Sequence, residues 1–513
     1  MLLSVLILRH GGICVILSIN LGENKKYLGK GLCILHNFLA GSFFIRLLSS
    51  AALWLDAQFS KSVIAAAFLQ DPTGRGGRSV FRHVFSFLHR ILFAAFRLLR
   101  LDRVLKGSVF MRTFFWCALA LCAAPLIPTM ALLGLVLVCF VSLAANFGCD
   151  RRLELTSAPV NIFIYLFALI YSVCTITSVD FRGSLNGGML IVIFILFSIV
   201  LQSAIKTKKQ TDILIYFLIA AGTLVAAYGV FQYILGVEGA AAWLDDEMFD
   251  SLSIRVYSTL DNPNVLAEYL LLVIPITIAT VFTAKTQSGK IYALCAAGCM
   301  CLAMLLTFSR GGWLGLVFAA AFFLVLMDRR FIVLGLIAAA AAVIVLPESV
   351  LGRFTSIGNM SDGSTSYRFS IWMGSLGMLA DYWFCGIGPG TAAFNKVYPL
   401  YSYNAATAQH AHNLYLQITC ETGVIGLLIF VALIFMFFKT TCSAVSRATD
   451  KTVRLRLIAV ISGILGFLVQ SMTDFTFYNY RVALIFWAFI ALGMILSRKN
   501  MISLDTSAED SAI

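Results

Sequence analysis

Two arginines and two histidines are the residues of this chain best placed to bind or move charge. Arg310 stands in the turn sequence Ser-Arg-Gly-Gly, Arg368 follows a Ser-Thr-Ser-Tyr run, and His410 and His412 end a long polar stretch. A guanidinium donates paired hydrogen bonds to phosphate or carboxylate oxygens, and an imidazole titrates near neutral pH. If the fold brings these groups together, they predict a site that binds an anion and transfers a proton.

His412 lies where the polar stretch changes into an apolar helix. On a helix beginning near His412, the side chains of Asn413, Gln417 and Glu421 recur every four residues and share one face. An imidazole above such a polar stripe indicates a function in so hydrophobic a chain. We expect Gln417 and Glu421 to orient the His412–Asn413 corner rather than to react, because they lie one to three turns into the apolar helix.

The histidines and cysteines do not predict a metal centre. The spacing of His410 and His412 is the one ligand-like spacing among six histidines, and the 13 cysteines include no Cys-x-x-Cys pair. Seven of the cysteines lie in apolar runs, where Cys packs as a small hydrophobe. We therefore expect neither a bound metal nor a disulfide framework.

The elements that position these residues must be membrane helices. The chain has 513 residues and is 60% hydrophobic and only 12% charged, which excludes a soluble domain of this size. The composition predicts an all-α bundle of about twelve transmembrane helices. The candidate spans are 110–125, 128–146, 159–178, 185–205, 211–235, 263–284, 290–308, 312–327, 331–347, 413–438, 454–473 and 481–497.

Lys and Arg in the short connectors orient this bundle. Basic residues recur in alternate connectors, from residues 151–152 to residues 498–499, whereas the other connectors are acidic or long. The positive-inside rule places the basic connectors and both termini in the cytoplasm. The long loop 348–412 and the turn that holds Arg310 then lie on the exoplasmic side. Both arginines and His412 can therefore converge on that side.

Residue type alone allows a second interpretation of the arginines. A guanidinium at the membrane edge can snorkel to the headgroups, and one in a loop can simply be solvated. Arg368, however, opens a predicted amphipathic helix along the membrane surface, and the N-terminal amides of that helix would favour a nearby anion. Residues 364–366 could cap its start. Its apolar residues are Phe369, Trp372, Leu376, Leu379 and Trp383.

Two other polar stretches predict turns rather than sites. The glycine-rich run 386–390 is followed by no Lys-Ser or Lys-Thr, so it lacks the features of a phosphate-binding loop. Asn262-Pro263-Asn264 is a helix-start signal.

The net charge of +13 is concentrated near the N-terminus. Residues 1–112 hold 15 Lys and Arg against 4 Asp and Glu. Within them, residues 80–106 predict a basic amphipathic helix that lies on an anionic membrane surface. Nucleic acid is the alternative partner, but the density of Phe and Leu favours lipid. We interpret residues 1–109 as a cytoplasmic or membrane-surface extension, 110–500 as the transmembrane domain and 501–513 as a short polar cytoplasmic tail.

Three motifs resemble those of one family. The segment 412–426, a His-Asn pair followed after nine residues by Gly-x-x-Gly, is similar to the signature of bacterial O-antigen ligases and the related lipid-linked polysaccharide polymerases. The Ser-Arg-Gly-Gly turn at 309–312 and the Arg-x-x-x-Trp helix at 368–372 resemble the two arginine motifs of that superfamily, in the same order. The similarity covers roughly residues 110–500.

The resemblance implies a multi-pass glycosyltransferase of the GT-C type in the bacterial inner membrane. Such an enzyme transfers a glycan from a polyprenyl (undecaprenyl) diphosphate carrier to an acceptor hydroxyl on the exoplasmic face, and lipopolysaccharide is one such acceptor. Arg310 and Arg368 would bind the diphosphate, and His412 would be the base, with His410 as the second candidate. Neither a metal nor another cofactor would be required.

Two further functions stay open. A polymerase that joins lipid-linked repeat units would use the same donor chemistry, and the glycan, lipid or cell-wall acceptor cannot be read from the chain. A transporter or flippase of lipid-linked sugars would also have about twelve spans. Transporters, however, place ionisable groups near the bilayer midplane, whereas here the informative charges are predicted at the exoplasmic edge.

Overall fold

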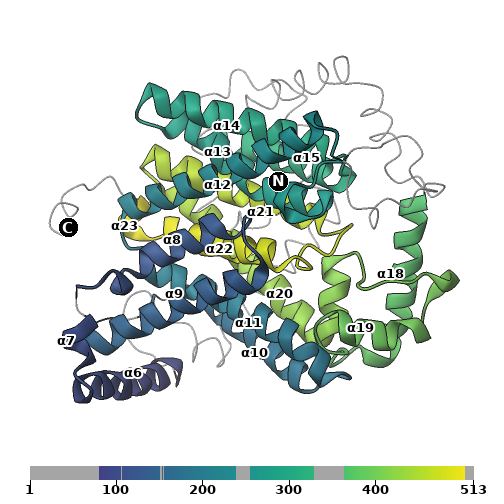
Figure 1. Cartoon of the computed structure of the whole chain (residues 1–513), viewed down its shortest axis with the longest axis horizontal. Coiled ribbons are helices and arrows are strands. Elements are labelled where there is room, and N and C mark those ends of the chain that lie inside the picture. The colour runs from purple at the N-terminus through teal and green to yellow at the C-terminus, as the bar shows by residue number, and fades with distance from the viewer. Residues whose placement is uncertain are drawn as a thin grey trace, which may run out of the picture.

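The chain folds into a helical bundle (Figure 1). The structure is a computed structural model that describes residues 80–502 except 106, 151, 152, 154, 157, 238–254 and 329–362. Within these ranges there are helices, turns and irregular segments but no strand, so the predicted all-α class is confirmed. The predicted extension before residue 80 and the tail after residue 502 lie outside the described residues.

Eight of the described helices are long and apolar enough to cross a membrane, and three shorter apolar helices accompany them. The eight are α9 (Thr129–Cys149), α11 (Phe181–Ala204), α12 (Lys208–Ile234), α13 (Pro263–Thr283), α14 (Gln287–Leu306), α15 (Arg310–Met327), α20 (Leu414–Arg447) and α21 (Lys451–Gln470). The shorter ones are α8 (Thr113–Ala123), α10 (Asn161–Ile176) and α22 (Tyr480–Leu496).

Each predicted span except one falls on one of these eleven helices. The exception, 331–347, lies outside the described residues, so the count of twelve stays a prediction. The remaining helical segments are short or lie beside the bundle. They are α6 (Val80–Leu98), α7 (Leu101–Leu105), η1 (Val109–Met111), η3 (Ser258–Leu260), α18 (Gly363–Tyr382), α19 (Thr391–Val397), η4 (Tyr398–Leu400), η5 (Tyr403–Ala405) and α23 (Lys499–Ile502).

The centre of the bundle is formed by α13, α21 and α22. In α22, all residues from Arg481 to Leu496 are buried, which is expected of a helix that is apolar all round and enclosed by other helices. The peripheral helices α9, α12 and α14 instead expose large apolar side chains such as Val141, Leu224 and Leu294. Such an outer surface suits contact with lipid tails rather than water.

The segment from α18 to the start of α20 forms a small separate core beside the bundle. Ile371, Met378, Phe394, Tyr398 and Cys420 are buried together there. In Figure 1, α18 and α19 lie at one end of the bundle, and α7 and α23 lie at the other. This places the predicted loop residues at the end opposite to α7. Which end faces the cytoplasm stays a prediction.

Candidate functional site

Three guanidiniums line one small pocket at the α18 end of the bundle. The side chains of Arg255, Arg310 and Arg368 surround a cavity of about 40 Å³. The pocket therefore brings together the two arginines that the sequence singled out and adds a third. The other lining residues are Asn264, Phe308, Ser309, Gly311, Ser364, Gln470, Thr473 and Asp474.

The Ser-Arg-Gly-Gly turn fixes Arg310 at the first position of α15. The Ser309 hydroxyl caps the helix by accepting a hydrogen bond from the Gly312 amide at 3.3 Å. A Cβ on Gly311 would lie 2.8 Å from Thr473 Oγ1, and one on Gly312 would lie 2.6 Å from the Ala267 Cβ. Only glycine permits these contacts, so the motif presses the start of α15 against α13 and the segment after α21.

Arg255 is tied to the same turn by its guanidinium. Its Nε donates to the Thr307 carbonyl at 3.1 Å and its Nη2 to Asn264 Oδ1 at 3.3 Å. Asn264 lies in the first turn of α13, where Asn262 is the N-cap and Pro263 the first helical residue, so the predicted helix start is confirmed. Arg255 thus joins the starts of α13 and α15 at the rim of the pocket.

Arg368 reaches the pocket from α18. Its Nη1 lies 3.3 Å from Ser364 Oγ, and its buried Nε has no hydrogen-bond partner within the described parts of the chain. A buried unsatisfied donor is costly unless a ligand satisfies it. The capping prediction was wrong: Gly363 and residues 364–366 are all helical, so none of residues 364–366 is the N-cap of α18.

Arg481, at the start of α22, shows what a structural arginine looks like in this protein. Its guanidinium donates to Asp261 Oδ2 and to the Thr259 carbonyl, both at 2.9 Å. The charge is thereby neutralised within the chain, as is usual for a cation buried at the edge of a membrane bundle. Among the described residues, the Arg368 guanidinium has instead one hydrogen-bond partner, the Ser364 hydroxyl at 3.3 Å, and its charge also acts on the carboxylate of Asp474.

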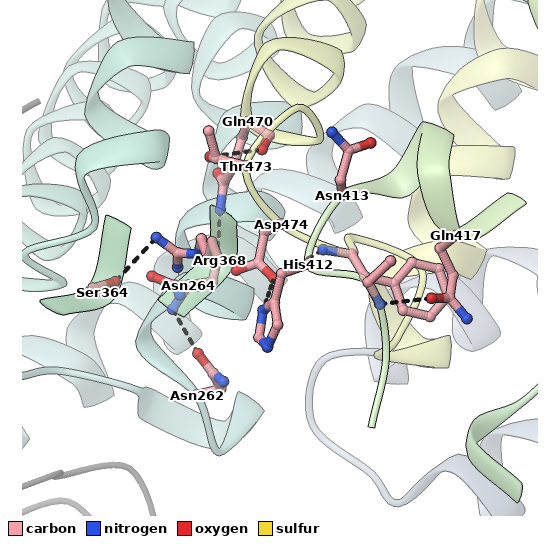
Figure 2. A network of polar contacts seen from close by, with 12 residues as sticks. Asn262, Asn264, Ser364, Arg368, His412, Asn413, Gln417, Gln470, Thr473 and Asp474 are labelled. Carbon is pink, nitrogen blue, oxygen red and sulfur yellow. Dashed lines mark hydrogen bonds and ion pairs between the residues drawn. The ribbon is translucent and has the colours of Figure 1, made fainter. Parts of the chain in front are cut away.

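His412 and Asp474 form a pair beside the arginines. The His412 Nδ1 lies 3.5 Å from Asp474 Oδ1, and Figure 2 shows Asp474 between Arg368 and His412. Burial alone would raise the pKa of Asp474, but the imidazole of His412 at ion-pair distance and the positive charge of Arg368 lower that pKa below its usual range. Asp474 is therefore a carboxylate at neutral pH.

The backbone around His412 is held in an unusual conformation. His412 has a φ of +44°, which costs about 1–3 kcal/mol for a residue with a side chain. Trp372 Nε1 donates to the His412 carbonyl at 3.3 Å, and the Leu414 amide donates to the Ser471 carbonyl at 2.9 Å. The Arg-x-x-x-Trp spacing thus places Arg368 and the group that holds His412 one helical turn apart on α18.

Asn413 links the start of α20 to the segment after α21; that it positions the site stays a prediction. It is the N-cap of α20, where its Oδ1 accepts from the Leu416 amide at 3.0 Å. Its Nδ2 donates to the Met472 carbonyl at 2.8 Å. Asn413 therefore ties the start of α20 to the segment that carries Asp474.

The predicted polar stripe continues below this corner as a chain of hydrogen bonds. Glu421 accepts from Gln417 Nε2 at 2.9 Å, from the Gly390 amide at 3.1 Å and from the Tyr171 hydroxyl at 2.9 Å. Gln417 in turn accepts from the Ala411 amide at 2.7 Å. This series of hydrogen bonds fixes the backbone at Ala411, the residue between His410 and His412. That Gln417 and Glu421 support the site rather than react stays a prediction.

His410 packs beside His412 in an apolar environment. The two ring centroids are 4.2 Å apart, and the His410 ring also contacts Phe475 and Tyr478. Burial, followed by the charge of His412, lowers the pKa of His410 to about 3, although Asp474 acts in the opposite direction. His410 is therefore neutral at physiological pH.

His410, His412 and Asp474 are also a possible metal-binding group. One ligand atom from each lies within 4.8 Å of the others. Two imidazoles and a carboxylate suit zinc or a similar divalent ion. The expected absence of a metal stays a prediction.

The glycine-rich run 386–390 is a turn, as predicted, and it packs against a break in α20. The amides of Ile387 and Gly388 donate to the carbonyls of Cys420 and Glu421 at 2.8 and 3.1 Å. The break itself is at Gly423, which has a φ of +70°. α20 is therefore two helical pieces joined at Gly423, and the first piece belongs to the site.

Replacing Gly423 with alanine should destabilise the protein by at least about 2 kcal/mol. The added Cβ would meet the Phe384 carbonyl oxygen at 1.9 Å, and the φ value is strained for alanine. Thermal unfolding of the detergent-purified protein would measure the loss. The matched control is Gly298→Ala in α14, where nothing lies within 4 Å of the new Cβ. A Gly423→Ala variant as stable as the control would contradict this account of the break.

Sequence reasoning did not select Asp474, Arg255, Gln470 or Thr473. Asp474 is the one acidic residue in the segment between the eleventh and twelfth predicted spans. Arg255 is the one basic residue in the otherwise acidic connector before Asn262. Both exceptions to the local charge pattern could have identified them. Gln470 and Thr473 carry no such signal.

The fold and the site together define a multi-pass helical membrane protein with a cation-lined pocket beside a His–Asp pair. Residues 295–431 match the family model described as O-antigen ligase. The match agrees with the resemblance seen in the motifs: this segment, about a quarter of the chain, is similar to a family of glycosyltransferase-like enzymes of the ligase or polymerase type. The segment includes Arg310, Arg368 and His412. No curated protein matches the chain.

Proposed function

We propose that the protein transfers a glycan from a polyprenyl diphosphate carrier, such as undecaprenyl diphosphate, to an acceptor hydroxyl on the exoplasmic face of the bacterial inner membrane. The observation that carries the proposal is the shared pocket of Arg255, Arg310 and Arg368 beside the His412–Asp474 pair. Guanidiniums suit a diphosphate because each can donate two hydrogen bonds to its oxygens.

In the proposed reaction, the acceptor oxygen attacks the anomeric carbon of the donor sugar, and the bond from that carbon to the phosphate oxygen breaks. The hydroxyl proton passes to His412, and the polyprenyl diphosphate leaves with the bonding electron pair. With its Nδ1 directed at Asp474, His412 has its Nε2 available to accept the proton. Arg310 and Arg368 bind the leaving diphosphate more strongly as its charge develops.

The environment of the two histidines favours His412 over His410 as the base. A general base works best when its pKa lies near the working pH, whereas the pKa of His410 is lowered to about 3. His410 also has no carboxylate at ion-pair distance, whereas His412 has Asp474 at 3.5 Å within the described structure. His410 is better suited to pack against His412 and keep water away from it.

The size of the pocket adds a requirement for substrate binding. A volume of about 40 Å³ holds only a few water molecules. A diphosphate would need more space, so α18 or the guanidiniums must move apart when the donor binds. Arg368 would then exchange its contact with Ser364 for contacts with phosphate oxygens.

A polymerase that joins lipid-linked repeat units is the second candidate function. It would use the same pocket and differ only in taking its acceptor hydroxyl from another lipid-linked glycan. The family match is compatible with both activities.

The proposal can be tested with the purified full-length protein and a polyprenyl diphosphate glycan, with and without a separate acceptor. Release of polyprenyl diphosphate that depends on the acceptor would indicate a ligase, and longer lipid-linked chains would indicate a polymerase. No release under any condition would contradict transferase activity and favour transport. The same transfer reaction run with a metal chelator tests whether the activity is independent of a metal. Activity lost to the chelator and restored by zinc would make His412 a metal ligand rather than the base.

Replacing Asp474 with asparagine should lower transfer by about 10- to 1,000-fold while the protein stays folded. Asparagine keeps the shape of the side chain but removes the charge that orients and stabilises the His412 imidazolium. Transfer should therefore also begin at lower pH in the variant, because the protonated ring loses its anionic neighbour. A pH–rate profile measures this effect. An unshifted profile with lower activity would assign Asp474 a purely structural role.

A further inference from the structure

A larger cavity lies at the other end of the bundle, far from His412. It has a volume of about 670 Å³ and is lined by the start of α8, the ends of α9 and α11, and the start of α12. The first turn of α11 approaches α19, since a Cβ on Gly183 would lie 2.4 Å from the Ala392 Cβ. The last turn of α11, with Ser203 and Ala204, lines the cavity. A helix of 24 residues separates the two ends by about 36 Å.

The cavity is polar at its mouth and apolar inside. The cations Arg112 and Lys206 lie just before the first residues of α8 and α12, and the Arg112 side chain is exposed. Leu119 and Phe217 line the cavity farther along the same helices, about 10 and 16 Å from these cations at the rise of an α-helix. A ligand that fills this cavity should therefore carry a negative group at one end of an apolar body.

A basic amphipathic helix flanks the cavity. In α6, His89 Nε2 lies 2.9 Å from the carbonyl of Phe147, which lines the cavity. The Phe96 ring packs so closely on α9 that a Cβ on Gly148 would lie 2.5 Å from it. α6 also exposes Phe87, Leu88 and Ile91 together with Arg90 and Arg97. Such a helix suits the interface of an anionic membrane, which would supply the ligand.

We propose that this cavity binds one anionic glycerophospholipid, with an acyl chain along α8 and α12 and the phosphate at the mouth beside Arg112 and Lys206. The volume is in the range that buries most of a drug-sized ligand. The apolar lining favours the lipid over free phosphate, because phosphate has no apolar part to bury against it. The two cations distinguish it from a lipid without net charge.

The test uses the delipidated full-length protein in detergent, titrated with phosphatidylglycerol or phosphatidylcholine and followed by native mass spectrometry. The wild-type protein should retain phosphatidylglycerol in preference to phosphatidylcholine. Arg112→Gln and Lys206→Gln should each weaken retention roughly fivefold, from about 1 kcal/mol per cation at an anionic surface. Lys209→Gln is the matched control, because it removes the same charge three residues away, in the first turn of α12, but does not line the cavity.

A second variant tests the apolar part independently. Ala118→Trp should fill the cavity and abolish retention of phosphatidylglycerol. A melting temperature close to that of the wild type, measured in lipid-free detergent, would show that the variant folds. The proposal fails if the wild-type protein retains phosphatidylcholine as well as phosphatidylglycerol. It also fails if the double variant Arg112→Gln/Lys206→Gln retains phosphatidylglycerol like the wild type, or if Ala118→Trp does. A thermal shift with inorganic phosphate equal to that with phosphatidylglycerol would make the mouth a phosphate site instead.

Discussion

Replacing His412 with alanine should lower glycan transfer by about 100- to 10,000-fold, while the protein is inserted and purified in normal amounts. The imidazole is the proposed proton acceptor, and among the described residues of the site it is the one imidazole with a carboxylate at ion-pair distance. His412 Nδ1 faces Asp474 at 3.5 Å, so the loss would remove the base and leave Asp474 beside Arg368. Release of polyprenyl diphosphate by purified protein is the measurement.

The matched control is His410→Phe, which removes the neighbouring imidazole but keeps a ring against Phe475 and Tyr478. We expect it to retain most of the activity. Equal losses in the two variants would mean that the histidines act as a unit, for example as metal ligands. Wild-type transfer by His412→Ala would remove the base assignment.

Replacing Arg368 with lysine should reduce transfer by roughly 100- to 1,000-fold, and Arg310→Lys should have a comparable effect. Lysine keeps the positive charge but loses the planar fork that can bind two phosphate oxygens. The buried Nε of Arg368 has no protein hydrogen-bond partner in the described structure, so its proposed partner is the substrate. The measurement is the rate of donor turnover at saturating acceptor.

The control for the arginine variants is Arg447→Lys, at the exposed last turn of α20, where we expect no effect on turnover. The double variant Arg310→Lys/Arg368→Lys should lose less than the product of the single losses, because the two groups are proposed to bind one diphosphate. Multiplicative losses would place the two arginines at independent sites and contradict the shared pocket.

The helices of the bundle could be predicted because their signal is local. An apolar run such as 263–284 must be buried or face lipid wherever it lies, and it became α13 with ends within one residue. The meeting of Arg310 with Arg368 followed from the alternation of basic connectors, which assigned both residues to the same end. That both line one pocket did not follow from the alternation, because it depends on how the side chains pack.

The partners of these residues could not be predicted in the same way. Asp474 is 62 residues from His412 in sequence, and nothing near it identifies the imidazole it faces. The break at Gly423 depends on the backbone of Phe384, which sequence periodicity does not place. The start of α18 was misplaced because residues 364–366 are of types that favour capping, whereas in the structure they are part of the helix.

The burial of α22 from Arg481 to Leu496 has a consequence for biogenesis. This helix packs against α9, α11, α13, α20 and α21, and the ribosome makes it after all of them. Until α22 is inserted, the earlier helices surround an unfilled centre, so the bundle cannot reach its native packing progressively as each span emerges. Assembly should therefore finish in one late step, and a chain truncated before Tyr480 should be degraded by membrane quality control rather than accumulate as a shorter bundle.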